Sequence, residues 1–371
     1  MTSGVSDVLI LGGGIIGCAA AEVLSRRGAA VTLLEPRGIG QGASHASAGM
    51  LAPFHEGRHD PVLLTLGERS LALYDGFVAS AAQGGRPVPY SRSGSVDVAF
   101  DAAAATALHQ TCDELHARGV SCEWLDHDAL RDSEPLIGPT AVAGLRIDEH
   151  GYVGVRDLVD ALWRQAERHG ARRVAAQARR VRTESKRLVR VETDSRWLEA
   201  PHVVLAAGCW AGEIDIGSDA PLPVRPVRGQ LIALGWDAPP LGSTLWGPRC
   251  YAVPWTDGTL LVGATTEEVG FDERATASGV QELLAAICEL APRARYAFFA
   301  GVRVGLRPGT PDDRPIVGAS SRIPGLVYAT GHYRNGALLA PITAAAIADM
   351  VEGRAPDAIW RLCSPDRFGT F

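Results

Sequence analysis

The sequence lacks the cysteine patterns of a disulfide-rich or zinc-binding protein. Its seven cysteines are odd in number, and no two of them are spaced as C-x-x-C. That spacing is typical of structural zinc sites, and evenly paired cysteines are typical of small secreted domains. We therefore predict that the thiols are reduced, that the protein is cytoplasmic and that it binds no metal.

The chain also has no excess of positive charge. Its net charge of −6 argues against a general surface for polyanions. Ten Lys and Arg residues do lie between Arg164 and Arg190. A site for single-stranded nucleic acid would interleave aromatic side chains with them, and only Trp163 flanks this segment. We interpret the segment as a solvated face and predict no nucleic-acid partner.

Long apolar runs are scarce too. The run from Val8 to Leu24 has no basic segment in front of it, contains Glu22 and is interrupted by four glycines. These features argue against a signal peptide and against a membrane span, so we predict no membrane partner. With 371 residues, of which 46% are hydrophobic and 21% charged, the chain has the composition of a globular enzyme. Its length allows two domains, or one domain with a large insertion.

The start of the chain has the pattern of a βαβ unit. Residues 7–11 form a short apolar run that is typical of a buried parallel strand. A glycine-rich turn and an alanine-rich helix follow, and the helix ends at basic residues before Gly28. A second strand at residues 31–34 leads to Glu35.

Each part of this unit suits a dinucleotide. In the G-x-G-x-x-G turn, Gly12 permits a tight turn, Gly14 lets a pyrophosphate approach the backbone, and Gly17 lets the helix pack close to the strand. The N-terminus of the helix offers free N–H groups to the phosphates. Glu35 is placed to accept hydrogen bonds from ribose hydroxyls. We predict a dinucleotide site here, and this unit alone leaves FAD and NAD open.

Residues 38–53 form a loop of mostly small side chains that includes the apolar pair Met50-Leu51. A loop of this length in a compact domain is usually functional or disordered, and its apolar residues argue against disorder. Because small side chains let the main chain lie against a flat ligand, we assign this loop to the dinucleotide or its ring.

The rest of the chain alternates between helical and extended patterns. Helices are predicted at residues 63–78, 102–118, 156–169, 279–290 and 340–351, and strands at residues 94–100, 172–181, 188–193, 203–208, 231–234, 250–254, 260–264 and 326–330. The strand at 203–208 is predicted to close the nucleotide-binding sheet. We predict an α/β fold with two interleaved domains. They are a Rossmann-like FAD-binding domain of residues 1–85, 145–220 and 305–371, and an α+β substrate-binding domain of residues 86–144 and 221–304 on a mostly antiparallel sheet.

Two motifs near the C-terminus complete the pattern. They are Gly-Leu-Arg-Pro-Gly-Thr at residues 305–310 and Gly-His-Tyr-Arg-Asn-Gly at residues 331–336. Together with the opening turn, the loop at 47–51 and the strand at 203–208, they resemble the D-amino acid oxidase family of flavoenzymes, and most closely its glycine oxidase branch. The likeness covers nearly the whole chain. It implies that FAD lies extended, from the first βαβ unit to the space between the two domains.

The resemblance implies which residues bind FAD. They belong to the glycine-rich turn, the small-residue loop and the segments near the ring, and they are Gly12, Gly14, Ile15, Ile16, Gly17, Glu35, Pro36, Ala43, Ser44, Ala48, Gly49, Met50, Ala178, Gly208, His332, Tyr333, Arg334, Asn335, Gly336, Ala337 and Leu338. Some relatives bond the flavin through a cysteine close to the position of Arg307. No cysteine lies between Cys288 and Cys363, so we predict non-covalent FAD.

The resemblance also implies a substrate site of Arg307, Arg334, Tyr251, Met50 and Ala52. Arg307 would pair with a substrate carboxylate, and Tyr251 would hydrogen-bond to the same group. A guanidinium is a planar fork that can hold a carboxylate through two parallel bonds. From the residues alone, Arg307 could be a surface arginine in a proline turn, Arg334 could pair with a nearby acid or with carbonyls at a helix end, and Tyr251 could be a core tyrosine. No residue is assigned as an acid or base, and a structural role is preferred for His332.

The activity that the resemblance implies is FAD-dependent oxidative deamination of a small amino acid, with glycine favoured over sarcosine and small D-amino acids. Hydride transfer to flavin N5 would give an imine that hydrolyses to a 2-oxo acid and ammonia, and O2 would reoxidise the flavin and yield hydrogen peroxide. The family's biology places this reaction in the synthesis of the thiamine thiazole and predicts a homo-oligomer, specifically a homotetramer.

Three alternatives are left open. The first is an oxidase or dehydrogenase acting on D-amino acids, N-methyl amino acids or imino acids. The second is a tRNA-modifying flavoenzyme, and the third is a non-catalytic FAD-binding protein.

Overall fold

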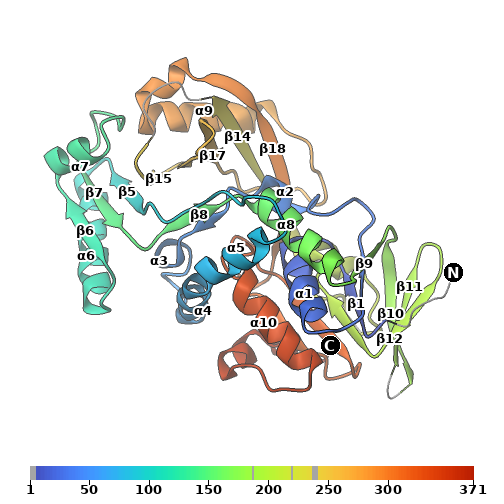
Figure 1. The fold of residues 1–371 in the computed structure, drawn as a ribbon. Helices are drawn as coiled ribbons and strands as arrows, with labels where there is room; N and C mark the ends of the chain where they lie inside the picture. Colours follow the sequence, from blue (N-terminus) through green and yellow to red (C-terminus); the bar gives the residue numbers. More distant parts are fainter. Residues whose placement is uncertain (1–5, 186–187, 219, 236–240) are drawn as a thin grey trace.

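The computed structural model describes residues 6–185, 188–218, 220–235 and 241–371 (Figure 1). Its strands form four sheets of six, eight, three and three strands. Figure 1 shows the eight-stranded sheet and its helices on one side of the molecule. The helices α1 and α10 lie on the other side, together with the strands of the six-stranded sheet. Residues 186 and 187 of the predicted basic segment lie outside the described residues.

The six-stranded sheet has the order β19-β20-β13-β1-β2-β9. Its strands are β1 (Val8–Leu11), β2 (Val31–Leu34), β9 (Arg172–Val174), β13 (His202–Leu205), β19 (Ile316–Ala319) and β20 (Leu326–Thr330). All neighbours are parallel except β19 and β20. Because β13 lies between β1 and β20, the prediction that residues 203–208 close the sheet is wrong. The C-terminal strands extend the sheet past it.

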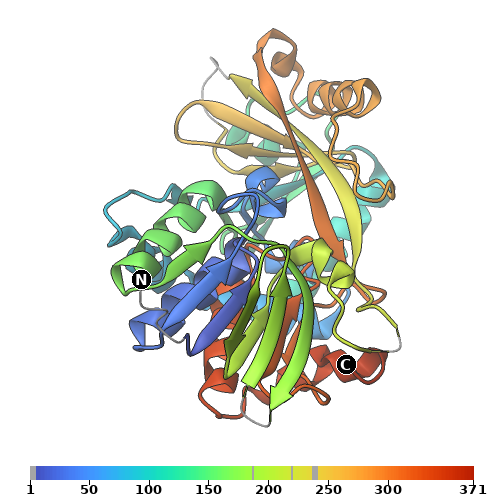
Figure 2. The ribbon, with the colours of Figure 1, turned by 90° about the vertical axis from the view of Figure 1, so that its right-hand side faces the viewer.

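The side chains of β1 alternate between two covering layers. Val8 and Ile10 pack in a cluster with helices, whereas Leu9 and Leu11 pack in a cluster with the second layer of strands. The helices are α1 (Ile15–Arg26), α4 (Pro61–Ala72), α5 (Tyr74–Ala82), α8 (Val155–Arg168) and α10 (Ala340–Val351). The second layer is a three-stranded sheet of β10 (Ala178–Ser185), β11 (Leu188–Thr193) and β12 (Trp197–Ala200), seen in front in Figure 2. Burial on both faces explains why the parallel strands are continuously apolar in sequence.

The eight-stranded sheet has the order β18-β14-β17-β16-β15-β5-β7-β6. Its strands are β5 (Ser95–Ala99), β6 (Cys122–Leu125), β7 (Ala143–Ile147), β14 (Arg225–Gly235), β15 (Thr244–Trp246), β16 (Tyr251–Pro254), β17 (Thr259–Gly263) and β18 (Phe298–Gly309). Only the β15–β5 pair is parallel. The long strands β14 and β18 pair antiparallel from Arg225 opposite Gly309 to Gly235 opposite Phe298. Figure 2 shows this pair running from the eight-stranded sheet toward the six-stranded one, so that it connects the two halves.

The remaining elements are short or cover the sheets from outside. They are β3 (Met50–Leu51), β4 (Tyr90–Ser91), β8 (Gly151–Val153), α2 (Ala43–Ala46), α3 (Pro53–Glu56), α6 (Ala102–Ala117), α7 (His127–Ser133), α9 (Ala277–Leu290) and the 3-10 helices η1 (Gly208–Glu213), η2 (Pro292–Tyr296), η3 (Ala358–Cys363) and η4 (Pro365–Phe368). The third small sheet, β3-β8-β4, pairs Met50 with Tyr152. It thereby ties the small-residue loop to residues 151–153.

The predicted fold class is confirmed, and several predicted elements need correction. The helix predicted at 63–78 is two helices that meet at Leu73. The strand predicted at 172–181 is two strands in different sheets, β9 and β10. The glycine- and proline-rich stretch at 305–309 is the end of strand β18, because pairing with β14 holds it extended. The small-residue loop contains the short elements α2 and β3.

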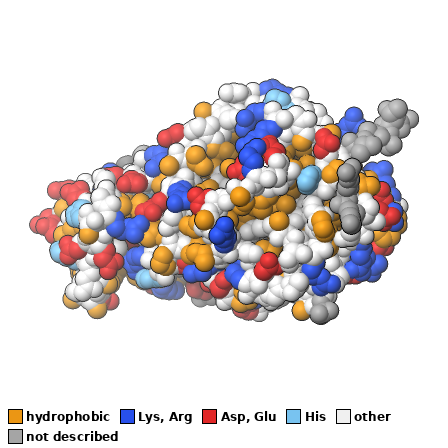
Figure 3. Space-filling model, turned by 90° about the horizontal axis from the view of Figure 1, so that it is seen from below, with side chains coloured by type: hydrophobic (Ala, Val, Ile, Leu, Met, Phe, Trp, Pro, Cys, Tyr) orange, Lys and Arg blue, Asp and Glu red, His pale blue; other side chains and the backbone are white. Residues whose placement is uncertain are grey.

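Charge is distributed evenly over the face shown in Figure 3, where acidic and basic side chains are interspersed. Arginines of the basic segment are matched with acids, as in Arg180 and Arg182, which both lie 2.8 Å from a carboxylate oxygen of Asp215. None of the helices in the described ranges is both long and apolar enough to cross a membrane.

Candidate active site

The glycine-rich turn forms a tight cradle at the end of β1. Gly12 has φ +110°, and a Cβ atom there would overlap the carbonyl oxygen of Ala206. A Cβ atom at Gly17 would overlap the carbonyl oxygen of Gly12, which explains why helix α1 can lie so close to the strand. The Ser44 hydroxyl of the small-residue loop accepts a hydrogen bond of 3.0 Å from the Ile15 N–H. The loop and the positive end of α1 therefore face one space, which suits a pyrophosphate.

Glu35 is held in place at the end of β2. Its two carboxylate oxygens accept backbone N–H bonds from Gly13 at 2.9 Å and from Arg37 at 2.7 Å. Each carboxylate oxygen keeps a free lone pair, so both can still accept bonds from ribose hydroxyls. The Arg37 guanidinium stacks over the Trp210 ring at 5.0 Å. This pair adds a flat wall beside Glu35 that the sequence did not predict.

A cavity of about 580 Å³ extends from this cradle to the eight-stranded sheet. It is lined by Gly12, Gly14 and Glu35 at one end and by Tyr251 and Arg307 at the other. The structure brings all but three of the predicted site residues to its wall. The exceptions are Gly17, which packs against Gly12, Ala52, which is buried in the apolar cluster around Tyr251, and Leu338, whose carbonyl accepts the Ser70 hydroxyl at 2.6 Å.

Arg307 projects from β18 as a cation without an acidic partner. Its Nη1 donates to the carbonyl oxygen of Thr265 at 3.0 Å. A Cβ atom at Gly229 on the paired strand would overlap the guanidinium, so a glycine is needed there for the side chain to pass. Within the described residues no carboxylate forms an ion pair with Arg307. Burial disfavours the charged guanidinium and lowers its pKa. A buried positive charge without an anionic partner is unfavourable, so this position suits an anionic ligand.

Arg334 lies in the same cavity but is already paired. Its Nε donates to Glu56 Oε2 at 2.9 Å, and Glu56 also lines the cavity at the end of α3. Burial opposes the charge on Arg334, but the carboxylate of Glu56 outweighs burial and raises the pKa of Arg334. This ion pair corresponds to the alternative role for Arg334, as the partner of a nearby acid.

Tyr251 and His332 are buried neutral groups at the cavity. Burial raises the pKa of Tyr251 to about 12, so its hydroxyl stays protonated and can donate a hydrogen bond. Burial lowers the pKa of His332 to about 3, and its Nε2 lies 3.1 Å from the Thr343 hydroxyl of α10. The contact of His332 with α10 suits a structural role.

Cysteine chemistry at the cavity is disfavoured. Cys209 lines the wall, and burial raises the pKa of its thiol to about 12. A thiol this hard to ionise is a poor nucleophile.

The donor set fits FAD along the whole cavity. Free N–H groups at α1 suit the pyrophosphate, Glu35 suits the ribose, and the small residues of the loop leave room for a flat ring system. Fold and cavity together suit a protein that binds a dinucleotide cofactor, with the far end of the cavity at the eight-stranded sheet.

Comparison with known proteins identifies the family. A family described as FAD dependent oxidoreductase, DAO, matches residues 7–350, and the chain belongs to it. The bifunctional protein ThiO/ThiG of Synechocystis is 37% identical over 98% of this chain and 54% of its own length. The chain thus spans about half the length of that relative.

Two solved structures are similar throughout. Glycine oxidase from Geobacillus kaustophilus is 31% identical with a TM-score of 0.94, and 98% of each chain is covered. Iminodiacetate oxidase from Chelativorans is 28% identical with a TM-score of 0.89, covering 96% of this chain and 98% of that one. The predicted resemblance to the D-amino acid oxidase family and the predicted FAD cofactor are thereby confirmed.

Sequence reasoning missed several residues of the cavity. Glu56 lines it beside Arg334, Gly229 lines it beside Arg307, and Trp210 and Arg37 form the wall beside Glu35. Thr265 does not line the cavity, but its carbonyl oxygen accepts a hydrogen bond from Arg307. Glu56 gives no local signal, because its partner Arg334 lies 278 positions away in the chain. Gly229 and Thr265 give none, because their contacts with Arg307 come from the pairing of β14 with β18 and with the segment that follows β17.

Proposed function

We propose that this protein oxidises a small amino acid, with glycine favoured, to an imine that hydrolyses to a 2-oxo acid and ammonia. The observation that carries the proposal is the guanidinium of Arg307, which has no carboxylate partner in the described part of the chain and lies at the sheet end of the cavity. Such a group takes a carboxylate through two parallel hydrogen bonds, which sets both its position and its orientation.

The surrounding residues would position the substrate for reaction at Cα. Arg307 holds the carboxylate, and the protonated hydroxyl of Tyr251 can donate to the same group. FAD held in this cavity would supply the hydride acceptor and the route by which the electrons reach O2, with hydrogen peroxide as the product. Orientation of this kind provides a large part of the rate in enzymes that do not need a protein base. Neither the buried His332 nor Glu56, held by Arg334, is assigned as a base.

The charge balance of the cavity favours a substrate with one carboxylate. Among the described residues Arg307 has no carboxylate partner, whereas Arg334 is paired with Glu56 at 2.9 Å. A second carboxylate on the substrate would have to displace Glu56 from Arg334. This supports glycine, sarcosine or a small D-amino acid over a dicarboxylate such as iminodiacetate.

The reaction would supply an imine to a pathway that consumes it. The similarity to a relative named ThiO/ThiG supports a place in the synthesis of the thiamine thiazole. The alternatives are oxidation of other D-amino, N-methyl or imino acids, and electron transfer to an acceptor other than O2. A tRNA-modifying activity has no support in the cavity, whose free cation suits a small carboxylate.

A substrate panel on the purified yellow holoenzyme tests the proposal. Peroxide release would be measured with glycine, sarcosine, D-alanine, L-proline and iminodiacetate, and flavin bleaching without O2 would be followed in parallel. The expected result is the highest kcat/KM with glycine, with peroxide and ammonia in equal amounts. Bleaching without peroxide would indicate a dehydrogenase, and no bleaching by any of these acids would overturn the proposal.

A further inference from the structure

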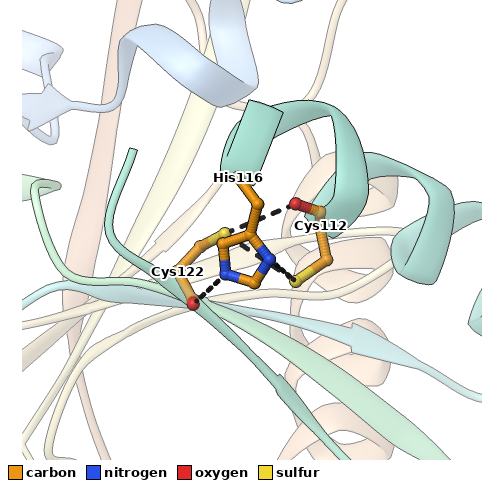
Figure 4. Close-up of side chains that lie close together, drawn as sticks. All are labelled: Cys112, His116 and Cys122. Atoms are coloured by element: carbon orange, nitrogen blue, oxygen red, sulfur yellow. Dashed lines mark hydrogen bonds between the residues drawn. The ribbon is translucent and has the colours of Figure 1, made fainter. Parts of the chain in front are cut away.

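Two cysteines and a histidine meet at the end of the molecule that lies away from the FAD cavity. Cys112 and His116 are one turn apart on α6, and Cys122 begins β6, the edge strand of the eight-stranded sheet. Figure 4 shows the three side chains converging. Their ligand atoms all lie within 4.8 Å of one another, and none of the three residues lines the cavity.

The histidine is oriented as a metal ligand would be. Its Nε2 lies 2.9 Å from the backbone carbonyl oxygen of Cys122, which can only accept. Nε2 therefore carries the proton, and Nδ1 keeps a lone pair 3.9 Å from Cys112 Sγ. Metal-bound histidines usually donate their second ring nitrogen to a carbonyl or carboxylate in this way.

The sulfur atoms have a separation that suits a shared tetrahedral ion. Cys112 Sγ and Cys122 Sγ are 3.7 Å apart. Two thiolates bound to zinc at about 2.3 Å in tetrahedral geometry lie about 3.8 Å apart. A disulfide would require the sulfurs to approach to about 2.05 Å, so this separation is that of an open pair.

One side of the cluster is buried in apolar side chains, and the other side is exposed to solvent. Cys112 is buried with Phe54, Leu64 and Leu115 in an apolar cluster, whereas His116 is exposed. Three protein ligands with one side open to solvent leave a fourth position for water.

We propose that Cys112, His116 and Cys122 bind one zinc-class divalent cation, which fastens the end of α6 to strand β6. The spacing C-x3-H-x5-C is not that of the common zinc motifs, so a search for those motifs does not find this site. Both thiols lose their protons on binding, which releases two protons per ion. Because binding releases protons, the affinity for the metal increases with pH.

The test uses the reduced, chelator-treated holoenzyme, with Zn2+ as the probe. Equilibrium dialysis and metal analysis measure the stoichiometry and the affinity, and circular dichroism verifies the fold of each variant. Wild type should bind one Zn2+ per chain. Loss of an outer-shell partner alone weakens metal binding about 10- to 100-fold, so Cys122→Ser, which removes a ligand, should weaken it at least about 100-fold.

His116→Gln changes an exposed side chain and should fold normally, which keeps the test decisive if Cys122→Ser is unstable. It should weaken binding at least about 10-fold. Cys288→Ser and His109→Gln are matched controls outside the cluster and should bind as wild type does. Equal zinc binding by His116→Gln and wild type, no bound zinc at all, or a Cys112–Cys122 disulfide in protein that holds no zinc would overturn the proposal.

Discussion

Arg334 and Glu56 form an ion pair of 2.9 Å across the candidate active site, between residues 278 positions apart in the chain. The same cavity contains Arg307, which lacks an acidic partner among the residues described here. The two arginines therefore have different tasks. One cation is balanced within the protein, and the other is left for a ligand.

Replacing Arg307 by Ala should greatly reduce turnover while leaving FAD bound. Loss of one partner of a buried charged pair costs about 2–5 kcal/mol, so kcat/KM for glycine should fall about 30-fold to several thousand-fold. Steady-state peroxide assays and the flavin absorbance per chain check both parts. Arg249→Ala, which removes an exposed arginine paired with Glu289, is the control. Full activity in Arg307→Ala would remove this residue from the substrate site.

Replacing Glu56 by Gln should shift preference toward dicarboxylates. The change frees Arg334 while keeping the size of the side chain, so a second substrate carboxylate would gain a cation. The ratio of kcat/KM for iminodiacetate to that for glycine should rise roughly 10-fold, as expected for about 1.4 kcal/mol of charge-assisted bonding. An unchanged ratio would mean that the Glu56–Arg334 pair does not select the substrate.

Denaturation with acid should release the flavin completely. Cys209 at the cavity has a thiol pKa of about 12, and the chain has no cysteine between Cys288 and Cys363. Trichloroacetic acid should therefore leave all yellow colour in the supernatant. Colour that stays with the pellet, together with a flavin-bearing peptide in mass spectrometry, would contradict non-covalent binding.

Buried histidines should make the protein less stable in acid. Phe54 N–H donates to His150 Nε2 at 3.3 Å, and His150 Nδ1 lies 2.7 Å from the Ser95 hydroxyl, so the ring is held neutral. Burial lowers the pKa of His150 from 6.5 to about 3. The pKa of His150 is lower in the folded state than in the unfolded state, so the neutral ring does not reduce stability above about pH 6.5. As pH falls from 6.5 toward 3, the free energy of unfolding decreases by roughly 1.4 kcal/mol per pH unit.

The measurement compares Tm at pH 7 and pH 5 for wild type and His150→Gln. The drop in Tm should be smaller in the variant, which has no proton to take up at this site. His109→Gln, at an exposed position on α6, serves as the control and should behave as wild type does. Identical drops in His150→Gln and wild type would show that His150 does not titrate on unfolding.

Self-association is expected at the edge of the eight-stranded sheet. Edge strand β18 and the preceding turn expose Tyr296 at 81%, Phe298 at 67% and Phe299 at 54%. Exposed apolar side chains along an edge strand are typical of an interface. Light scattering should show an oligomer for wild type and a smaller species for the double variant Phe298→Ser/Phe299→Ser. The control Trp197→Ser changes an exposed tryptophan elsewhere and should not change the mass of the particle in solution. A monomeric wild type would contradict self-association through β18.

Sequence alone identified the parts of this protein whose chemistry is local. Two glycines of the turn can be read locally: Gly12 has φ +110°, and a Cβ atom at Gly17 would overlap the carbonyl oxygen of Gly12 within the same turn. Helix α10 was predicted with its observed bounds, since its apolar pattern and its proline in the first turn act over a few residues. The family resemblance then supplied FAD and a list of site residues.

Tertiary structure decided what depends on distant contacts. Residues 305–309 look like a turn in sequence, and only pairing with β14 makes them a strand that points Arg307 into the cavity. Nothing in the sequence around Glu56 indicates its role, because that role is the ion pair with the distant Arg334. Cys112, His116 and Cys122 likewise become a cluster only when α6 folds back on β6. Local backbone preferences can be read along the chain, but the charge balance of a site is set by which side chains the fold brings together.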